Sequence, residues 1–329
     1  MKKLLIVCGP TATGKSLLAL KLAKKFGGEI VSADSRQIYR GMDIGTGKEL
    51  PVNSKLKIQN LKLGGYYKID GVRIWGYDIA DAKKGFSVAQ YIKIAREIID
   101  NILARGKLPI LVGGTGLYIK GVVDGIATAQ VPPNLKLRKS LSEKNSEELF
   151  EILAQVDAMK AGSLNTSDRK NPRRLIRAIE VALNKSKIKV QKTLLKADTL
   201  FVGLYAPKAV IGKRINLRVD SRTDLGIEKE IKSLLSSGVK WGSQAMDSLG
   251  YRQWKKYFEN PGKALLQETI KSWKSEEHSY ARRQMTWFKK DKRINWFDIS
   301  TDSWGKNVEK LVEKWYSGEN SKFQMPNSK

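Results

Sequence analysis

The sequence predicts an α/β fold: a parallel sheet flanked by helices, with an all-helical insertion domain. Short apolar runs at 4–8 and 108–112 are typical of parallel strands, which are covered on both faces. Helical patterns alternate with these runs, and such alternation favours a parallel sheet. Near Gly125 the pattern changes, and the chain is charged and helical from there to about Lys196.

The first part of the chain alternates strand and helix. After a glycine-containing loop, apolar residues at helical spacing predict a helix over 19–26, which ends at Gly27-Gly28. A second short strand is expected at 29–33, and a one-sided apolar pattern predicts a helix over 87–104. The Lys-rich stretch 48–68 has no clear periodicity and receives no assignment.

The later part returns to strands after the helical segment. The run 131–133 indicates a linker, and strands are expected at 200–205 and 294–299, with a helical block between them. We therefore expect a core formed by 1–124 and 197–316, and a helical insertion at 125–196. The polar tail 317–329 is expected to be disordered.

Composition narrows the function. The chain has 61 Lys and Arg against 33 Asp and Glu, a formal net charge of +28. Such a charge attracts polyanions and favours nucleic acid as a partner, although a merely lysine-rich surface is the alternative interpretation. The single cysteine excludes a disulfide within the chain. The single histidine argues against a histidine-based zinc site and a Ser-His-Asp triad.

The apolar runs of the chain are too short to form a membrane-spanning helix. No run approaches the roughly 18 apolar residues of a membrane span. The apolar start is short and leads directly into the glycine loop, so we interpret it as a strand and not as a signal peptide. We expect a cytoplasmic monomer.

The strongest motif is a phosphate-binding loop at 9–16. It fits the pattern G-x-x-x-x-G-K-[ST] without mismatch, with a predicted strand before it and a helix after it. Backbone N–H groups of such a loop bind phosphate oxygens, the lysine neutralises their charge, and the serine can ligate Mg²⁺. The residues expected to bind the phosphates are Gly9, Pro10, Thr11, Ala12, Thr13, Gly14, Lys15 and Ser16. The fold expected is thus a P-loop NTPase-like one.

Two further features follow neighbouring strands. Asp34 ends the second strand, at the sheet edge where ligands bind in α/β proteins, and could hold Mg²⁺ or act as a general base. A helix N-cap is its structural alternative. The segment 113–118 offers glycines for close backbone approach and the hydroxyl of Thr115. No acidic residue ends the 109–113 strand, which argues against a simple NTP-hydrolysing machine.

Basic and aromatic clusters occupy the rest of the chain. Arg173 and Arg177 are spaced to share one helix face, and 282–290 mixes cationic side chains with aromatic ones that we expect to be exposed. Arginine for phosphates and aromatic rings for base stacking suit single-stranded RNA loops. Each cluster alone is more often a solvated helix face.

The ordered set of motifs resembles the tRNA dimethylallyltransferase family. The matching segments are 9–16, 34–39, 42–48, 86–89, 112–118, 171–180, 214–218, 250–253 and 283–288. They span almost the whole chain in the family's order, which makes the set far more specific than the P-loop alone.

The resemblance implies a reaction. The P-loop would bind the diphosphate of dimethylallyl diphosphate, with Mg²⁺ on Ser16 as cofactor; whether Thr115 or Asp34 joins Ser16 stays open. The adenosine next to the anticodon, position 37 of the tRNA, would attack through N6. Asp34, Lys15 and Thr115 would be the catalytic residues, with Asp34 accepting the N6 proton.

The resemblance also implies the RNA contacts. The insertion would clasp the anticodon stem-loop. The residues expected at the RNA are Asp34, Ser35, Arg36, Gln37, Thr115, Arg173, Arg174, Leu175, Ile176, Arg177, Arg218, Arg283 and Gln284.

The chain departs from the family pattern at four places. Residues 75–78 stand where the family usually has a His pair, and 163–168 lacks the usual His-Pro-Asn. Gly47 replaces a usual alanine, and Arg222 replaces a common methionine. None of these touches the P-loop or Asp34, so they bear on fine specificity and not on the reaction class.

Three other functions stay open from sequence. An adenylate prenyltransferase would use the same chemistry on a free nucleotide, but the net charge and the Arg–aromatic clusters favour RNA. A P-loop nucleotide kinase would need ATP. An RNA-binding protein with a vestigial P-loop is disfavoured by the intact Lys15, Ser16 and Asp34.

Overall fold

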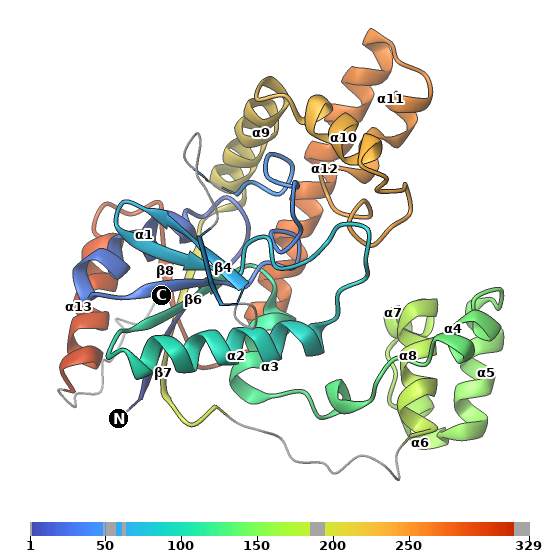
Figure 1. Cartoon of the computed structure of the whole chain (residues 1–329), viewed down its shortest axis with the longest axis horizontal. Coiled ribbons are helices and arrows are strands. Elements are labelled where there is room, and N and C mark those ends of the chain that lie inside the picture. The colour runs from blue at the N-terminus through green and yellow to red at the C-terminus, as the bar shows by residue number, and fades with distance from the viewer. Residues whose placement is uncertain (1, 49, 51–56, 61–63, 185–194, 319–329) are drawn as a thin grey trace. The chain divides into compact units, whose positions relative to one another are not determined.

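The computed structural model describes residues 2–48, 50, 57–60, 64–184 and 195–318 (Figure 1). Contacts divide the chain into two compact units, one formed by Met1–Val122 with Lys196–Lys329 and the other by Val123–Leu195. From residue 319 on, the tail predicted to be disordered lies outside the described residues. No helix in the described part is long and apolar enough to cross a membrane.

The larger unit is built on one eight-stranded sheet of order β3-β4-β5-β2-β6-β1-β7-β8. The six strands from β5 to β8 pair in parallel, which confirms the predicted fold class. Its strands are β1 (Lys3–Cys8), β2 (Glu29–Ser32), β3 (Lys57–Asn60), β4 (Gly64–Ile69), β5 (Val72–Trp75), β6 (Pro109–Gly113), β7 (Asp198–Tyr205) and β8 (Ile294–Asp298). β1 lies at the centre because Leu5 pairs with both Ile110 and Leu200.

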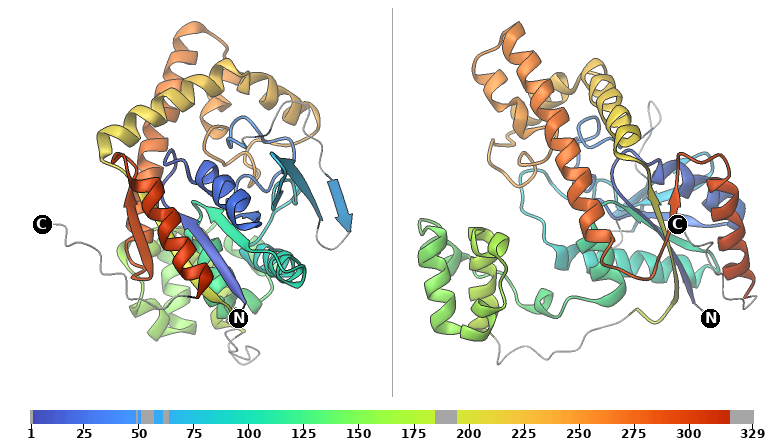
Figure 2. Two further views of the ribbon diagram at one scale, coloured as in Figure 1. Left: turned by 90° about the vertical axis from the view of Figure 1, so that its left-hand side faces the viewer. Right: turned by 180° about the vertical axis from the view of Figure 1, so that it is seen from behind.

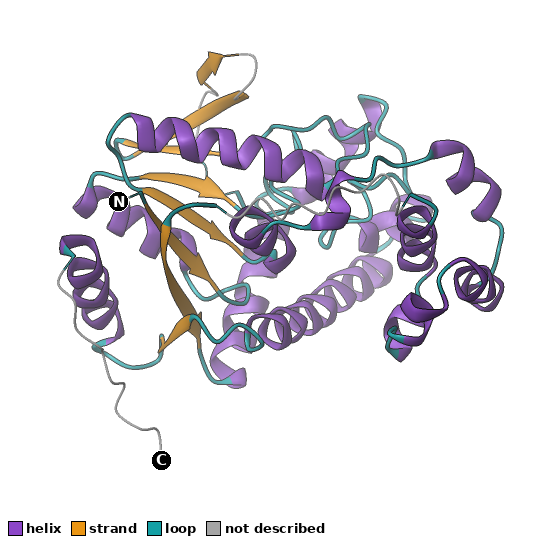
Figure 3. Ribbon diagram, turned by 90° about the horizontal axis from the view of Figure 1, so that it is seen from below, coloured by secondary structure: helices purple, strands orange, loops and turns teal. Residues whose placement is uncertain are grey.

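Helices cover both faces of this sheet, as Figures 2 and 3 show. α1 (Lys15–Phe26) and α13 (Trp304–Ser317) share one apolar core with alternate strand residues such as Leu5 and Val7. α2 (Val88–Ala104) packs on the other face through residues such as Tyr91 and Ile99, which are buried. Ser87 begins α2 by accepting a hydrogen bond from the backbone N of Gln90, which caps the helix.

An antiparallel extension was not predicted. β3, β4 and β5 form a meander in which β4 pairs antiparallel with β5, and Tyr66 lies opposite Trp75. The stretch 48–68, which received no assignment, supplies β3 and β4. Its polar character has a physical reason: β3 is the edge strand and carries the exposed Lys57, and the next strand, β4, carries the exposed Lys68.

Two long helices stand beyond the carboxyl edge of the sheet. α9 (Lys208–Asp224) and α12 (Lys263–Phe288) pack side by side (Figure 1). α10 (Ile227–Ser236) and α11 (Lys255–Glu259) attach to them. These helices face the edge at which β1, β2 and β6 end, so they form a wall over the loops that follow these strands.

The second unit is entirely helical, apart from its loops, over the residues that the structure describes. α3 (Gly116–Asp124) crosses into it from the larger unit. Its own helices are α4 (Leu135–Leu141), α5 (Ser146–Val156), α6 (Ala158–Gly162), α7 (Thr166–Arg169) and α8 (Pro172–Ala182). A separate apolar core holds them together, with Leu149, Leu153 and Leu175 each fully buried.

Candidate active site

The phosphate-binding loop joins β1 to α1, as the motif predicted. The Thr13 hydroxyl donates a 2.9 Å hydrogen bond to the Pro10 carbonyl oxygen, which fixes the loop internally. The Lys15 ammonium group bonds the same carbonyl and lies 3.5 Å from the Thr13 Oγ1. Lys15 and Ser16 both line one cavity. The loop therefore presents a cation and a hydroxyl to whatever occupies that cavity.

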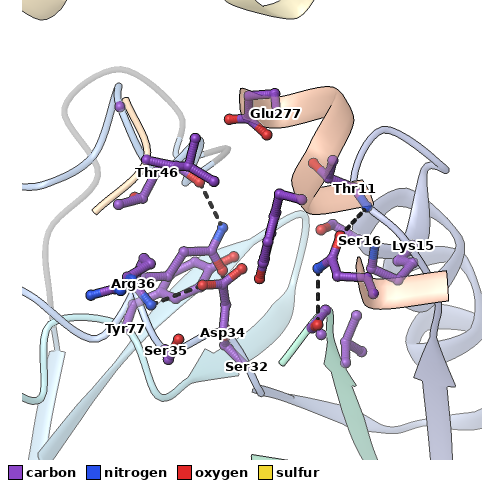
Figure 4. Close-up of a pocket in the computed structure, with 18 of the residues that line it drawn as sticks. Thr11, Lys15, Ser16, Ser32, Asp34, Ser35, Arg36, Thr46, Tyr77 and Glu277 are labelled. Atoms are coloured by element: carbon purple, nitrogen blue, oxygen red, sulfur yellow. Dashed lines mark hydrogen bonds between the residues drawn. The ribbon is translucent and has the colours of Figure 1, made fainter. Parts of the chain in front are cut away.

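Gln284 of α12 supports the loop from the far side of the cavity. Its Oε1 accepts from the Thr11 backbone N at 2.8 Å, and its Nε2 donates to the Gly114 carbonyl oxygen at 2.9 Å, both drawn in Figure 4. The side chain is buried. Gln284, which the sequence predicts at the RNA, holds two ligand-facing loops together in this structure.

Two arginines of α9 approach the same loop. Arg218 Nη1 donates to Thr11 Oγ1 at 3.2 Å, and its Nη2 donates to the Gly47 carbonyl oxygen at 3.4 Å. Arg214 Nη1 lies 3.5 Å from the Ala12 carbonyl oxygen. Arg218, which the sequence predicts at the RNA, lies beside the P-loop, and a guanidinium group there could bind a phosphate.

Asp34 lies where the sequence placed it, just beyond the end of β2. Its Oδ1 accepts a 2.9 Å hydrogen bond from the Arg36 backbone N, so the local turn orients the carboxylate (Figure 4). Asp34 lines the same cavity as Lys15 and Ser16. Among the described residues, no hydrogen bond reaches its second oxygen, Oδ2, which is therefore available to accept a proton.

Thr115 fixes the same turn from the next strand. Its Oγ1 accepts from the Ser35 backbone N at 3.0 Å and lies 3.3 Å from the Ser35 hydroxyl oxygen. The buried phenol of Tyr280 also bonds Thr115, and burial raises the pKa of that phenol. Thr115, predicted to be catalytic, is thus held in contacts that position the Asp34 turn.

Gln37 and Arg36 are also engaged within the protein. Gln37 Oε1 accepts from the Ser32 hydroxyl at 3.1 Å, while its Nε2 donates to the Gly47 carbonyl oxygen at 3.1 Å. Arg36 Nη1 donates to the Gln244 carbonyl oxygen at 2.9 Å. These two side chains connect β2 to the loop over 42–48 and to the segment after α10.

The loop over 42–48 matches the family pattern, but the residue that holds it in place was not predicted from the sequence. Glu230 of α10 accepts hydrogen bonds from the backbone N atoms of Asp43, Ile44 and Gly45, at 2.8, 2.7 and 3.1 Å. The Tyr251 hydroxyl donates to the same carboxylate at 2.6 Å. Three successive N–H groups on one carboxylate hold the loop rigidly at the rim of the cavity. The sequence signal was only a glutamate among others on an amphipathic helix.

The cavity has a volume of about 290 Å³ and lies within the larger unit. Apolar side chains on the strands, Ile30, Ile74 and Val112, line one part of it. Polar and acidic residues line other parts, together with six cationic side chains: Lys15, Arg36, Arg218, Arg222, Arg252 and Arg283. An apolar pocket beside a cluster of cations fits a small hydrophobic group attached to phosphates.

A resident metal would have few protein ligands here. The described residues contain no cluster of three His, Cys, Asp or Glu side chains that could hold an ion. Ser16 and Asp34 are among the side chains with oxygen donors that line the cavity. This donor set fits Mg²⁺, which usually binds through one or two protein oxygens and the phosphates of a substrate.

The helical unit presents a mixed set of the predicted RNA residues. Arg173 and Arg174 of α8 are exposed, and Arg174 pairs with Asp168. The Leu175 side chain is fully buried in the core of the unit, so it supports α8 and cannot reach RNA. Ile176 is half-buried and packs against that core. Arg177 Nη2 donates to the Val131 carbonyl oxygen at 2.9 Å, which fastens α8 to the segment before α4.

The cluster of arginines and aromatic residues over 282–290, at the end of α12, contains both exposed and buried side chains. Trp287 is 45% exposed, as expected, whereas Phe288 is 3% exposed and packs inside the protein. The expectation that both rings are exposed was therefore wrong for Phe288, because consecutive helical residues point about 100° apart and Phe288 points into the protein. Arg283 lines the cavity beside Gln284.

Fold and site together define a class of protein. A parallel sheet with a phosphate-binding loop after β1, an acidic residue just beyond β2, which β6 separates from β1, and a partly apolar pocket indicates a P-loop enzyme that transfers a group from a phosphorylated donor. The family model described as IPP transferase matches residues 37–291, and that described as isopentenyl transferase matches residues 2–61. The chain belongs to the IPP transferase family.

Curated relatives agree with this assignment. The chain is 39% identical over 321 residues to the tRNA dimethylallyltransferase of Carboxydothermus hydrogenoformans, covering 94% of this chain and 96% of the relative. It is 36% identical over 307 residues to the enzyme of the same name from Anoxybacillus flavithermus, covering 92% of each.

Solved structures are similar as well. The full-length tRNA isopentenylpyrophosphate transferase of Bacillus halodurans aligns with a TM-score of 0.67 and 31% identity, over 97% of this chain and 96% of the other. A eukaryotic dimethylallyltransferase aligns with a TM-score of 0.79 at 22% identity, over 98% of this chain and 82% of the other, which shows the shared fold.

Proposed function

We propose that the chain transfers the dimethylallyl group of dimethylallyl diphosphate to N6 of the adenosine next to the anticodon of tRNA. One observation carries this proposal: Lys15, Ser16 and Asp34 line a single cavity that also has an apolar part, formed by Ile30, Ile74 and Val112. The P-loop end takes the diphosphate, the strand side chains take the prenyl chain, and the carboxylate meets the nucleophile. The donor and the modified atom follow from the family to which the chain belongs.

The reaction breaks one bond and forms another at C1 of the prenyl group. The N6 lone pair attacks C1, the C1–O bond breaks, and the electron pair leaves with diphosphate. Asp34 Oδ2 accepts the N6 proton, which balances the charge on the new C–N bond. Lys15 and Arg218 stabilise the negative charge that develops on the departing diphosphate. Bound Mg²⁺, held by Ser16 and the phosphate oxygens, would add further charge neutralisation there.

Several residues position these groups without acting on the substrate. Thr115 fixes the Asp34 turn, and Gln284 fixes the P-loop backbone at Thr11. Because the reacting atoms must align within a fraction of an ångström, such supports contribute to rate as well as to stability.

The RNA surface is proposed to include the helical unit and the basic rim of the cavity. Arg173 and Arg174 are exposed on α8, and Trp287 is exposed at the end of α12. The net charge of +28 supports attraction to the phosphate backbone. The adenine must leave its stack to enter the cavity, as base-modifying enzymes require. We expect a monomer that works in the cytoplasm.

One assay separates the candidate functions. The protein is incubated with labelled dimethylallyl diphosphate, Mg²⁺ and either bulk tRNA or AMP, and ATP consumption is followed in parallel. We expect label in tRNA only. Label in AMP alone would favour an adenylate prenyltransferase, and ATP turnover without label transfer would favour a nucleotide kinase; either result would overturn the proposal.

A further inference from the structure

A third arginine of α9, Arg222, lies one helical turn beyond Arg218 and lines the same cavity. Arg222 is 6% exposed, and its Nη1 lies 3.2 Å from Glu277 Oε1 on α12. Its guanidinium carbon lies 6.0 Å from the centre of the Trp273 ring. Among the residues that the structure describes, its buried Nε has no hydrogen-bond partner. An arginine so deeply buried, with a donor left over, needs an explanation.

The backbone opposite Arg222 leaves room for it. Gly47 has a φ of 64°, and a β-carbon there would overlap the Nη2 atoms of both Arg222 and Arg218. The two guanidinium groups therefore lie against the same glycine. Positions 47 and 222 are two of the places where the sequence departs from the family pattern, and the structure shows that they touch.

Two guanidinium groups share a small volume beside Gly47, and Glu277 forms an ion pair with Arg222. Burial and then the charge of Arg218 lower the pKa of Arg222 to about 10, so the group stays protonated at neutral pH. A buried guanidinium group that keeps an unpaired donor is costly unless an anion joins it.

The available anion is the diphosphate that Lys15 and Arg218 also face. We propose that Arg222 is a second arginine, beside Arg218, that binds the diphosphate of the prenyl donor. Glu277 and Trp273 hold its guanidinium in place, and Gly47 provides the space; Glu277 is labelled at the cavity in Figure 4. This inference rests on the proposed function and adds to it a ligand of the leaving group.

Inorganic pyrophosphate is the probe, because it needs neither tRNA nor turnover. Its affinity with Mg²⁺ is measured by calorimetry for the wild type and for Arg222→Met/Glu277→Gln, which removes both charges and leaves no unpaired ion. We expect the double variant to bind about 10-fold more weakly, since a charge-assisted hydrogen bond is lost. Lys213→Met deletes an exposed charge from the same helix and should bind as the wild type does.

A structural ion pair would give a different result. If the pair only stabilised the fold, its neutral replacement would leave pyrophosphate affinity within about two-fold of the wild type, which would overturn the inference. Arg222→Lys retains the buried charge next to Glu277 and so protects the fold; it should bind about 3-fold or more weakly because the planar fork is lost. A wild type that fails to bind pyrophosphate would instead refute the proposed function, and the inference with it.

Discussion

Glu180 joins three segments of the helical unit through one buried carboxylate. Its buried carboxylate accepts hydrogen bonds from Arg138 Nε at 2.7 Å, Arg138 Nη2 at 2.8 Å, Arg177 Nη1 at 3.0 Å and the Asn134 backbone N at 2.9 Å. Burial alone would raise the pKa of Glu180, but these hydrogen bonds outweigh it and lower the pKa from 4.5 to about 2. We therefore expect Glu180→Gln to destabilise this unit selectively.

The magnitude follows from the pKa. A decrease from 4.5 to about 2 corresponds to about 3 kcal/mol of stability for the ionised form. That contribution is fully present above pH 4.5 and is lost as the pH falls from there towards 2. Since a small unit loses roughly 1–2 kcal/mol of stability per molar urea, Glu180→Gln should lower the urea midpoint of the unit by about 2 M. The variant should also lack the acid-dependent loss.

The chain offers two independent probes for this test. All eight tryptophans lie outside residues 123–195, so tryptophan fluorescence reports on the larger unit alone. Far-ultraviolet circular dichroism reports on helices in both units. In Glu180→Gln the circular dichroism should show an early transition while the fluorescence transition stays in place. Glu151→Gln, an exposed glutamate on α5, is the matched control and should change neither.

Two results would refute this reasoning. One is an unchanged circular dichroism transition in Glu180→Gln. The other is a fluorescence transition that shifts in parallel with it, because the units would then unfold together. If the account holds, the variant should also bind tRNA more weakly while its affinity for pyrophosphate is unchanged.

Three further changes test the catalytic unit. Asp34→Asn keeps the hydrogen bond to Arg36 but removes the base, so turnover should fall about 100-fold or more while tRNA affinity stays within a few-fold; equal losses would count against the general base. Gln284→Leu releases Thr11 and Gly114, so the KM for the prenyl diphosphate should rise about 10-fold, and an unchanged KM would contradict the support role. Gly113→Ala would force a β-carbon onto the Ala33 carbonyl oxygen, so the unfolding free energy should fall by about 1–3 kcal/mol or more; a stable variant would refute this close approach.

The parallel core could be predicted because its strands are buried on both faces. Runs such as 4–8 and 108–112 are apolar throughout, and the P-loop fixes where the first strand ends and the first helix begins. The antiparallel meander could not be predicted, because its strands are short, partly exposed and rich in lysine and glycine. Such strands are defined by their partners in the sheet and not by local periodicity.

The candidate site likewise contains residues that could be predicted from the sequence and residues that could not. Lys15, Ser16 and Asp34 lie in local motifs, so their shared location at the sheet edge follows from the fold. The tasks of Gln284 and Glu230 could not be predicted from the sequence, because each binds backbone atoms 170 or more residues away. The sequence also could not show that two adjacent aromatic residues differ in exposure: Trp287 is exposed, whereas Phe288 is buried.

The most direct test of the central claim identifies the modified nucleoside. A tRNA transcript with adenosine next to the anticodon is incubated with dimethylallyl diphosphate and the protein, digested and examined by mass spectrometry. A matched transcript carries guanosine at that position. We predict N6-dimethylallyladenosine from the first transcript and none from the second. Modification of both transcripts, or of neither while the prenyl diphosphate is consumed, would contradict the account.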